Sequence, residues 1–396
     1  MRIRTFLALL ATLSITTTLY SQATAPRPVT TVRGLVVITT SNGLQTGKVS
    51  EIIAVPVRGQ VRGLPQVTLI GNAGPTMKTA LQEAVRVARQ RDERAASTAI
   101  EISFDEKYSP KDGGSAGTAF TLAILSTLGH FEIASDCAVT GDITVDEKVR
   151  PVGGIRHKVH GAALDRMQRV GVPTNAETPL LDGVLLDGTG LLWETQVFSI
   201  RTLDDAIALV RKDSDAKLLE ACKLFDEVRQ AMAKRPVGDL ATDAAAAKKL
   251  ARVLELAPNH LSAALLMKLS TGKPSEKLSL GTSLEEMAGA LGKLRPLLKW
   301  GDYAMGENGQ FDQPDLDAVQ KALKRVRPLL DPKLDQAGQA AEEYVAVCEA
   351  LLVARKTGAR GMRSAMEACR DKRNALKSEL QKITADKETF EKLIRE

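Results

Sequence analysis

Aromatic residues are scarce in this chain, and blocks of like charge are absent. Phe, Trp and Tyr make up 4% of the 396 residues, too few for the stacked aromatic platforms that bind single-stranded nucleic acid. The formal net charge is +6, but lysine and arginine are interleaved with acidic residues almost throughout. Because a nucleic-acid-binding surface needs clustered basic residues, the composition predicts that nucleic acid is not a partner.

Long apolar runs are missing beyond residue 20, where no stretch reaches the roughly 20 residues of a spanning helix. The N-terminus differs: Arg2 and Arg4 precede a short apolar stretch, and the small-x-small sequence Ser21–Ala23 follows. That order is typical of a secretory signal peptide. We therefore expect residues 1–23 to be a signal peptide, residues 24–30 a linker, and the protein to be exported to the periplasm or secreted. An uncleaved membrane anchor is the alternative.

Metal-binding patterns are also missing. The four histidines and four cysteines form neither an HExxH motif nor a zinc-ligand spacing, so metal-dependent hydrolysis is not expected and no cofactor is predicted. Cys348 and Cys369 lie at similar distances from the turn at 356–361. If the flanking segments form an antiparallel helical hairpin, the two thiols lie level with each other. A disulfide, which export favours, and a pair of buried free thiols are both consistent with that placement.

Short apolar runs separated by Gly and Pro fill residues 31–212. The first three runs predict strands in an antiparallel arrangement, at 32–40, 49–57 and 65–71. Further strands are predicted at 99–104, 136–141, 143–145 and 193–200. Helical spacing predicts helices over 76–95, 115–128, 155–169 and 203–212. Because strands and helices mix without regular alternation, we predict an α+β domain.

The pattern changes at residue 213, after which Ala, Leu, Lys and Glu recur with a helical period. We predict an all-α domain over 213–396, with helices at 215–234, 240–256, 260–270, 283–299, 314–330, 336–356 and 362–394. Ser283 with Glu286 predicts a capping box at the start of one of them. Residues 247–268 resemble a tetratricopeptide-type helix pair, the only unit of that kind legible in the sequence.

The run PKDGGSAG at 110–117 places Ser115 at a loop-to-helix junction, where the first amides of a helix are free to support a charged oxygen. Serine is a poor nucleophile unless a base takes its proton, and no histidine lies in a hydrolase signature. Lys158 follows the Gly153–Gly154 turn in the first turns of a helix, where the macrodipole disfavours a cation. Apolar neighbours would desolvate it, and a lysine of lowered pKa can act as a base. A solvated helix lysine is the alternative.

These residues occur in a familiar order. PKDGGSAG, the run TGDITVDEKVRPVGGIRHK at 140–158, and the separation between Ser115 and Lys158 together resemble the proteolytic domain of Lon proteases. The resemblance covers roughly residues 31–212. It implies a Lon-type α+β fold in which Ser115 is the nucleophile and Lys158 the general base. It also implies a polypeptide substrate and, because Lon domains typically assemble as hexamers, a homo-oligomeric ring.

The same resemblance assigns supporting roles to four more positions. Thr140 would hydrogen-bond the lysine, and Asp112 would line the site. The oxyanion hole would consist of backbone N–H groups around Gly113, Gly114 and Ser115.

The chain also departs from the Lon pattern. Gly114 stands where the usual run has proline, Asp142 where glutamate is common, and Glu101 and Ser103 where many Lon proteins carry histidines. Residues 61–88 resemble the start of Lon-related competence proteins, whose Lon-fold domain is not regarded as a working Ser–Lys protease. Lon proteases normally carry an ATPase module, but the sequence contains no G-x-x-x-x-G-K-[ST] loop.

Two hypotheses follow. The first is an exported, ATP-independent serine endopeptidase of Lon type that uses Ser115 and Lys158 on unfolded or flexible polypeptides, with the helical domain recruiting substrates or a protein partner. The second is a catalytically silent Lon-fold protein that acts as a binding or assembly module through its helical domain. The two differ in whether a buried Lys158 serves the Ser115 hydroxyl.

Overall fold

The structure of the chain is a computed structural model that describes residues 29–40, 45–57, 66–272, 275–294, 298, 311–357 and 361–387. The predicted signal peptide lies outside the described residues. Within the described ranges, no helix combines the length and the apolar character that crossing a bilayer requires.

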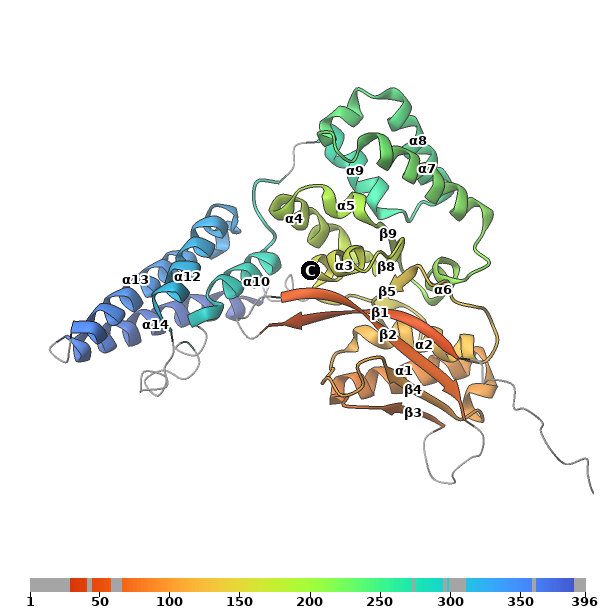
Figure 1. The fold of residues 1–396 in the computed structure, drawn as a ribbon, viewed down its shortest axis with the longest axis horizontal. Helices are drawn as coiled ribbons and strands as arrows, with labels where there is room; N and C mark the ends of the chain where they lie inside the picture. The colour runs from red at the N-terminus through yellow and green to blue at the C-terminus, as the bar shows by residue number, and fades with distance from the viewer. Residues whose placement is uncertain are drawn as a thin grey trace, which may run out of the picture.

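A seven-stranded mixed sheet forms the centre of the N-terminal part of the molecule (Figure 1). Its strands run in the order β3-β4-β2-β1-β5-β8-β9. Their bounds are β1 Thr30–Thr39, β2 Gln45–Pro56, β3 Val67–Ile70, β4 Ile100–Phe104, β5 Cys137–Val139, β8 Arg169–Pro173 and β9 Gln196–Ile200. A separate two-stranded sheet pairs β6 (Asp142–Ile143) with β7 (Val149–Arg150). The predicted α+β character of this region is confirmed.

Two details of the strands differ from the prediction. β1 and β2 form the expected antiparallel hairpin. β3 was also expected in an antiparallel arrangement, but it pairs parallel with β4. The reason is helix α1 (Pro75–Arg91), which returns the chain to the same end of the sheet, as parallel pairing requires. β8 was not predicted, because the expected helix 155–169 in fact ends at Leu164 and a buried strand follows.

Helices cover the sheet on both sides of the long β1–β2 hairpin. α1 packs against α2 (Gly117–Thr127) on one side, and α3 (Ile155–Leu164) lies on the other (Figure 1). Residues 117–125 of α2 are all buried, as its apolar sequence predicts. α3 approaches β2 closely at Gly47: a Cβ there would lie 1.8 Å from the carbonyl oxygen of His157. Only glycine therefore allows α3 to rest on the hairpin in this position.

The remaining helices of this part lie along the far edge of the sheet and beyond it. They are α4 (Glu177–Asp187), α5 (Gly190–Glu194), α6 (Leu203–Val210), α7 (Ala216–Met232), α8 (Ala244–Leu256) and α9 (Leu261–Thr271). The residues that lead into α9 pair with edge strand β9: Ser199 N–H donates to the Asn259 carbonyl and Val197 N–H to the Ser262 hydroxyl. An open sheet edge is thereby covered.

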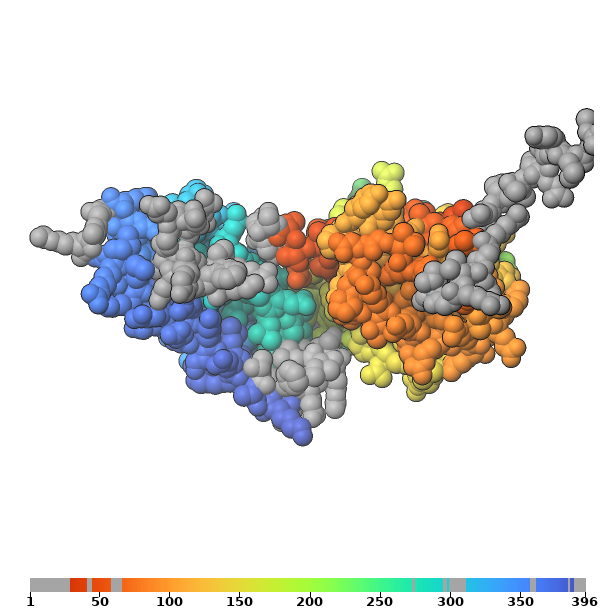
Figure 2. Space-filling view, turned by 90° about the horizontal axis from the view of Figure 1, so that it is seen from below, coloured from red at the N-terminus to blue at the C-terminus, as the bar shows by residue number. Residues whose placement is uncertain are grey.

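The apolar interior is divided in two. One core includes the sheet and continues through α7, α8 and α9 to Leu269. The second core extends from Leu280 to Ile383, within helices α10 (Leu280–Ala290), α12 (Gln313–Val326), α13 (Asp335–Thr357) and α14 (Met362–Ala385). The division between the cores falls beyond the predicted domain boundary at residue 213. Figure 2 shows the C-terminal helices as a lobe beside the part that contains the sheet.

The mostly helical character after residue 213 is confirmed, but the capping box at Ser283 is wrong. α10 begins one turn earlier, with Ser279 as its N-cap, whose hydroxyl accepts from the Thr282 N–H. Ser283 lies inside the helix and accepts from the Asp331 N–H. Glu286 faces the other core and forms an ion pair with Arg156. Glu286 therefore makes a tertiary contact instead of the capping interaction that the local sequence pattern predicted.

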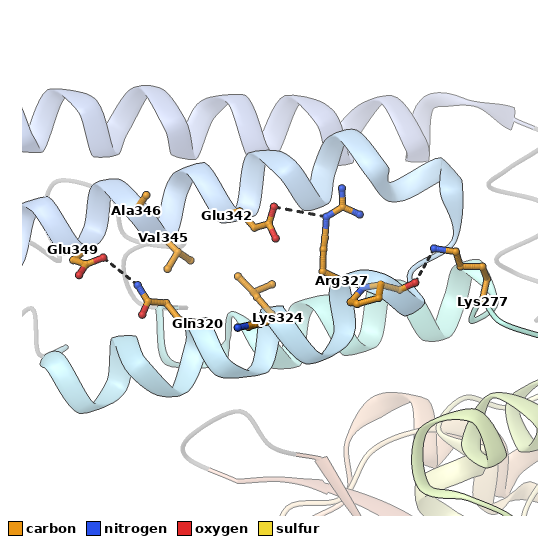
Figure 3. A pocket seen from close by; sticks show the side chains of 10 residues that line it. Lys277, Gln320, Lys324, Arg327, Glu342, Val345, Ala346 and Glu349 are labelled. Atoms are coloured by element: carbon orange, nitrogen blue, oxygen red, sulfur yellow. Dashed lines mark hydrogen bonds and ion pairs between the residues drawn. The ribbon is translucent and has the colours of Figure 1, made fainter.

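The C-terminal helices hold two further features. Cys348 on α13 and Cys369 on α14 are buried free thiols, and Cys369 Sγ donates to the Val347 carbonyl at 3.3 Å. Of the two alternatives for this pair, the structure therefore has the free thiols and not the disulfide. A groove of about 640 Å³ lies between α12 and α13 (Figure 3). Leu323 and Val345 contribute apolar surface to it, and charged side chains that include Lys324 surround them.

Candidate active site

Ser115 lies where the sequence placed it, at the entry to a buried helix. It is the middle residue of the short 3-10 helix η2 (Gly114–Ala116), which continues directly into α2. The side chain is half-buried. Because the first N–H groups of a helix lack intrahelical acceptors and carry the positive end of its dipole, this position favours negative charge on an oxygen close to Ser115.

Lys158 is buried, with 4% of its surface exposed. It occupies the first turns of α3, and its backbone N–H donates to the Gly154 carbonyl. Its ammonium group donates to Thr140 Oγ1 at 3.1 Å, the hydrogen bond that the resemblance implied. Burial lowers the pKa of Lys158 to about 8, because a low-dielectric surrounding disfavours the charged form. The solvated-lysine alternative is therefore wrong.

The segment that follows β5 links the serine loop to the residue that holds Lys158. The Gly141 N–H donates to the Ser115 carbonyl at 3.0 Å, and the Thr118 N–H of α2 donates to the Gly141 carbonyl at 3.0 Å. Thr140, which holds Lys158, is the adjacent residue. One backbone hydrogen bond and the peptide bond between Thr140 and Gly141 thus connect the serine loop to the residue that accepts the hydrogen bond from Lys158. Among the described residues, Thr140 is the hydrogen-bond partner of the ammonium group, and Ser115 Oγ does not bond it directly. Catalytic hydrogen bonds are often long without substrate.

Asp112 fixes the serine loop through backbone hydrogen bonds. Its Oδ1 accepts from the Met77 N–H at 2.9 Å, in the first turn of α1, and from the Gly113 N–H at 2.8 Å. These backbone hydrogen bonds lower the pKa of the Asp112 carboxyl. The carboxylate therefore anchors the serine loop to α1. Gly74 makes the anchor possible, since a Cβ on it would lie 2.3 Å from Asp112 Cγ.

This anchor changes the expected oxyanion hole. Because the Gly113 N–H is donated to Asp112, it is not available to a substrate oxygen. The amides of Gly114 and Ser115, at the start of η2, are the remaining donors of the predicted set. Gly113 instead provides the turn, with φ of 122° and ψ of 148°, a conformation that residues with a Cβ rarely adopt.

Asp142 lies directly beside the serine loop. A Cβ on Gly114 would be 3.4 Å from Asp142 Cγ, and one on Gly117 would be 3.1 Å from Asp142 Oδ1. The carboxylate accepts from the Ile143 N–H at 2.9 Å, and burial raises its pKa. Asp142 therefore packs against the two glycines that flank the serine. The sequence marked this position as a departure from the usual glutamate but not as a contact of the nucleophile loop.

The groove between α12 and α13 is not part of this site, since none of the residues that line it belongs to the Ser115 or Lys158 surroundings. In the part of the chain that the structure describes, no group of three or more His, Cys, Asp or Glu side chains is placed to hold a metal ion.

Comparison with known proteins finds relatives of the part of the chain that contains Ser115 and Lys158. Residues 14–184 match the family model described as Lon protease (S16) C-terminal proteolytic domain. A Lon protease of Anaeromyxobacter dehalogenans is 35% identical over 130 residues, which cover 30% of this chain and 15% of the relative. A Lon protease of Paraburkholderia phytofirmans is 34% identical over 158 residues, 37% of this chain and 19% of the relative.

A third Lon protease, of Geobacter metallireducens, is 27% identical over 180 residues, which cover 42% of this chain and 21% of the relative. The chain thus spans about a fifth or less of the length of these relatives, and the residues that match the family model include Ser115 and Lys158. The motifs and the family match agree that residues 14–184 are similar to the Lon protease (S16) C-terminal proteolytic domain.

Proposed function

We propose that this protein is an exported serine endopeptidase that cleaves unfolded or flexible polypeptides through Ser115 and Lys158, without ATP. One observation carries the proposal: a buried lysine whose pKa is lowered to about 8 is held by Thr140 beside the serine loop. Such a lysine is neutral in a useful fraction of molecules near pH 7 to 8. A neutral amine is the form that can accept the serine proton.

In the proposed cycle, the neutral Lys158 amine takes the proton of Ser115 while the serine oxygen attacks the scissile carbonyl. The Ser115 amide, at the start of η2, stabilises the resulting oxyanion. Lys158 then donates its proton to the leaving amine, which leaves an acyl ester on Ser115. A water molecule, deprotonated by the same lysine, hydrolyses the ester and restores the serine.

The test is hydrolysis of an unstructured peptide that carries a fluorophore and a quencher. Wild type is compared with Ser115→Ala and Lys158→Ala, each checked for native unfolding behaviour. We expect both variants to lose turnover, and an acyl-enzyme to be detectable by mass spectrometry in wild type alone. Equal rates for all three proteins would refute the peptidase and favour the silent binding module. That module predicts instead a defined protein partner whose binding survives Ser115→Ala.

Export and ATP independence are the parts of the proposal that rest on sequence. The Arg2/Arg4 and apolar pattern supports export, and the absence of a phosphate-binding loop from these 396 residues supports ATP independence. Fractionation followed by N-terminal sequencing should find a mature protein that begins after Ala23. An intact N-terminus in the membrane fraction would identify an anchor instead. Peptide hydrolysis should proceed at the same rate with and without Mg-ATP.

We also propose that the helical region after residue 213 recruits a polypeptide or a partner and that the proteolytic domain assembles as a ring. The tetratricopeptide-like segment 247–268 supports recruitment, and the Lon resemblance supports the ring. Sedimentation of the purified protein tests assembly: a hexamer is expected, and a monomer at micromolar concentration would contradict it.

A further inference from the structure

The helix that carries Lys158 is tied to the C-terminal helices by a buried ion pair. Arg156, two residues before the lysine on α3, pairs with Glu286 of α10. The two side chains are 15% and 13% exposed, so the pair is largely removed from water. The same guanidinium donates to Asp187 of α4 at 3.0 Å. Arg156 therefore links the first turn of α3 to one helix of its own core and one of the other core.

A second contact fixes α10 in place at this junction. Asp182 of α4 is 5% exposed and accepts from the Ser279 N–H at 3.0 Å and the Ser279 hydroxyl at 2.5 Å. Ser279 is the N-cap of α10. Because its start is held by Asp182, α10 presents Glu286 to Arg156 from a defined position.

Other charged groups at the junction show the same removal from water. Burial raises the pKa of Glu285, although Arg156 acts on it in the opposite direction. Burial and the neighbouring Arg156 lower the pKa of His157 to about 4. Arg325 contributes a second cation, 3.7 Å from Glu286. Arg156 thus lies between two carboxylates and Glu286 between two cations, and loss of one partner leaves a largely buried charge with one counter-ion fewer.

The start of α3 lacks a side-chain cap. Its N-cap is Gly154, in the left-handed region with φ of 68°. Lys158 lies one turn further on, with its ammonium group at 3.1 Å from Thr140. Because displacement by about 1 Å can cost a hundredfold in rate, the position of this turn matters for proton transfer.

We propose that Arg156 and Glu286 are positioning residues through which the C-terminal helices hold the first turn of α3, and with it Lys158, where the lysine can serve Ser115. The inference rests on the proposed peptidase function for its catalytic consequence. The C-terminal helices then help to position the catalytic lysine, in addition to any recruitment of substrate.

The experiment compares full-length wild type with Glu286→Gln, which removes the charge and keeps the shape. We expect kcat to fall about tenfold to a hundredfold with KM changed less than about twofold. We also expect the acid limb of the pH–rate profile to move to higher pH, as a loosened and hydrated lysine becomes more basic. Amide hydrogen exchange over residues 155–160 should be faster than in wild type. Glu286→Asp, which restores the charge, should recover part of kcat.

Glu343→Gln is the matched control, since it removes an ion pair with Lys372 that lies wholly within the C-terminal helices. It should leave kcat, the pH profile and exchange over α3 unchanged. If Glu286→Gln does not fold, Ser279→Ala takes its place, because it removes one hydrogen bond to Asp182 and should shift the same three readouts in the same direction.

The outcomes separate the two proposals. Wild-type kcat and wild-type exchange in Glu286→Gln would overturn the positioning role. A lower kcat without a shifted pH profile or faster exchange over α3 would overturn it too, since the loss would not act through Lys158. If wild type itself shows no Ser115-dependent hydrolysis, the peptidase proposal fails, and hydrogen exchange alone still decides whether α10 holds α3.

Discussion

Replacement of Lys158 by methionine should abolish hydrolysis and at the same time stabilise the fold. Methionine keeps the length of the side chain but carries no charge. The ammonium group is buried, and its pKa falls from the ordinary lysine value of 10.5 to about 8. At about 1.36 kcal/mol for each pKa unit, holding the protonated lysine in this site costs about 3 kcal/mol. Methionine removes that cost.

Part of the gain is offset, because Thr140 loses its hydrogen-bond donor. An unpaired buried hydroxyl costs about 1 kcal/mol or more. The variant should therefore be more stable than wild type by about 1–3 kcal/mol at pH 7, as measured by urea unfolding. Removing a catalytic group commonly exchanges function for stability in this way.

The pH dependence follows from the same shift. The unfolded chain binds the lysine proton up to pH 10.5, whereas the folded protein releases it above about 8. Wild-type stability is therefore lowest below pH 8 and rises between pH 8 and 10.5. The advantage of Lys158→Met should shrink over that interval. Hydrolysis by wild type should increase about tenfold per pH unit below pH 8, and about one molecule in ten should hold the neutral amine at pH 7.

Lys248→Met is the matched control, since Lys248 is an exposed helix lysine, and it should change neither stability nor activity. The reasoning would be refuted if Lys158→Met were less stable than wild type at pH 7. It would equally be refuted by a pH–rate profile whose acid limb lies near pH 10, the range of an ordinary lysine.

Three further predictions concern single residues. Thr140→Val should lower the free energy of unfolding by about 1–3 kcal/mol at pH 7, and by less above pH 8, where Lys158 is neutral. If urea unfolding shows the same loss of stability at both pH values, this prediction is contradicted. Gly114→Pro should stabilise the protein by about 0.4–1 kcal/mol and keep kcat within about threefold, because the Ser115 amide remains; a loss on the order of a hundredfold would make the Gly114 amide an essential oxyanion donor. Burial lowers the pKa of His260 to about 3, so the free energy of unfolding should decline as the pH falls below 6.5, by about 2 kcal/mol at pH 5. His260→Gln should remove that decline when unfolding is measured at pH 5 and above pH 6.5.

The chemistry of the site was accessible from sequence because its signals are local. Ser115 lies within one short run of small residues, and Lys158 follows a Gly–Gly turn on an amphipathic helix. In the structure Ser115 lies at the entry to α2 and Lys158 in the first turns of α3, and Lys158 makes the hydrogen bond to Thr140 that the resemblance implied. The geometry around them was not accessible in the same way. Asp112 reaches across to the first turn of α1 and takes the Gly113 amide, a contact that depends on where α1 lies in space.

The same contrast explains the errors in the fold. The helices after residue 213 follow from their period, but the cap assigned to Ser283 was wrong, because Asp182 fixes the start of α10 one turn earlier. The direction of β3 was wrong because strand pairing depends on the path of α1 and not on the residues of the strand. β8 was missed because a five-residue buried strand does not differ in pattern from the end of a helix.

The sequence by itself determined most of the helices and strands, and the motifs around Ser115 and Lys158 that resemble the Lon proteolytic domain. These follow from residue types and spacings over a few turns of chain. Only the tertiary structure decided that the lysine is desolvated, which amides remain for an oxyanion, and that Glu286 reaches Arg156 from 130 residues away. Such properties depend on burial and on contacts between distant segments, which the order of residues in a single chain does not display.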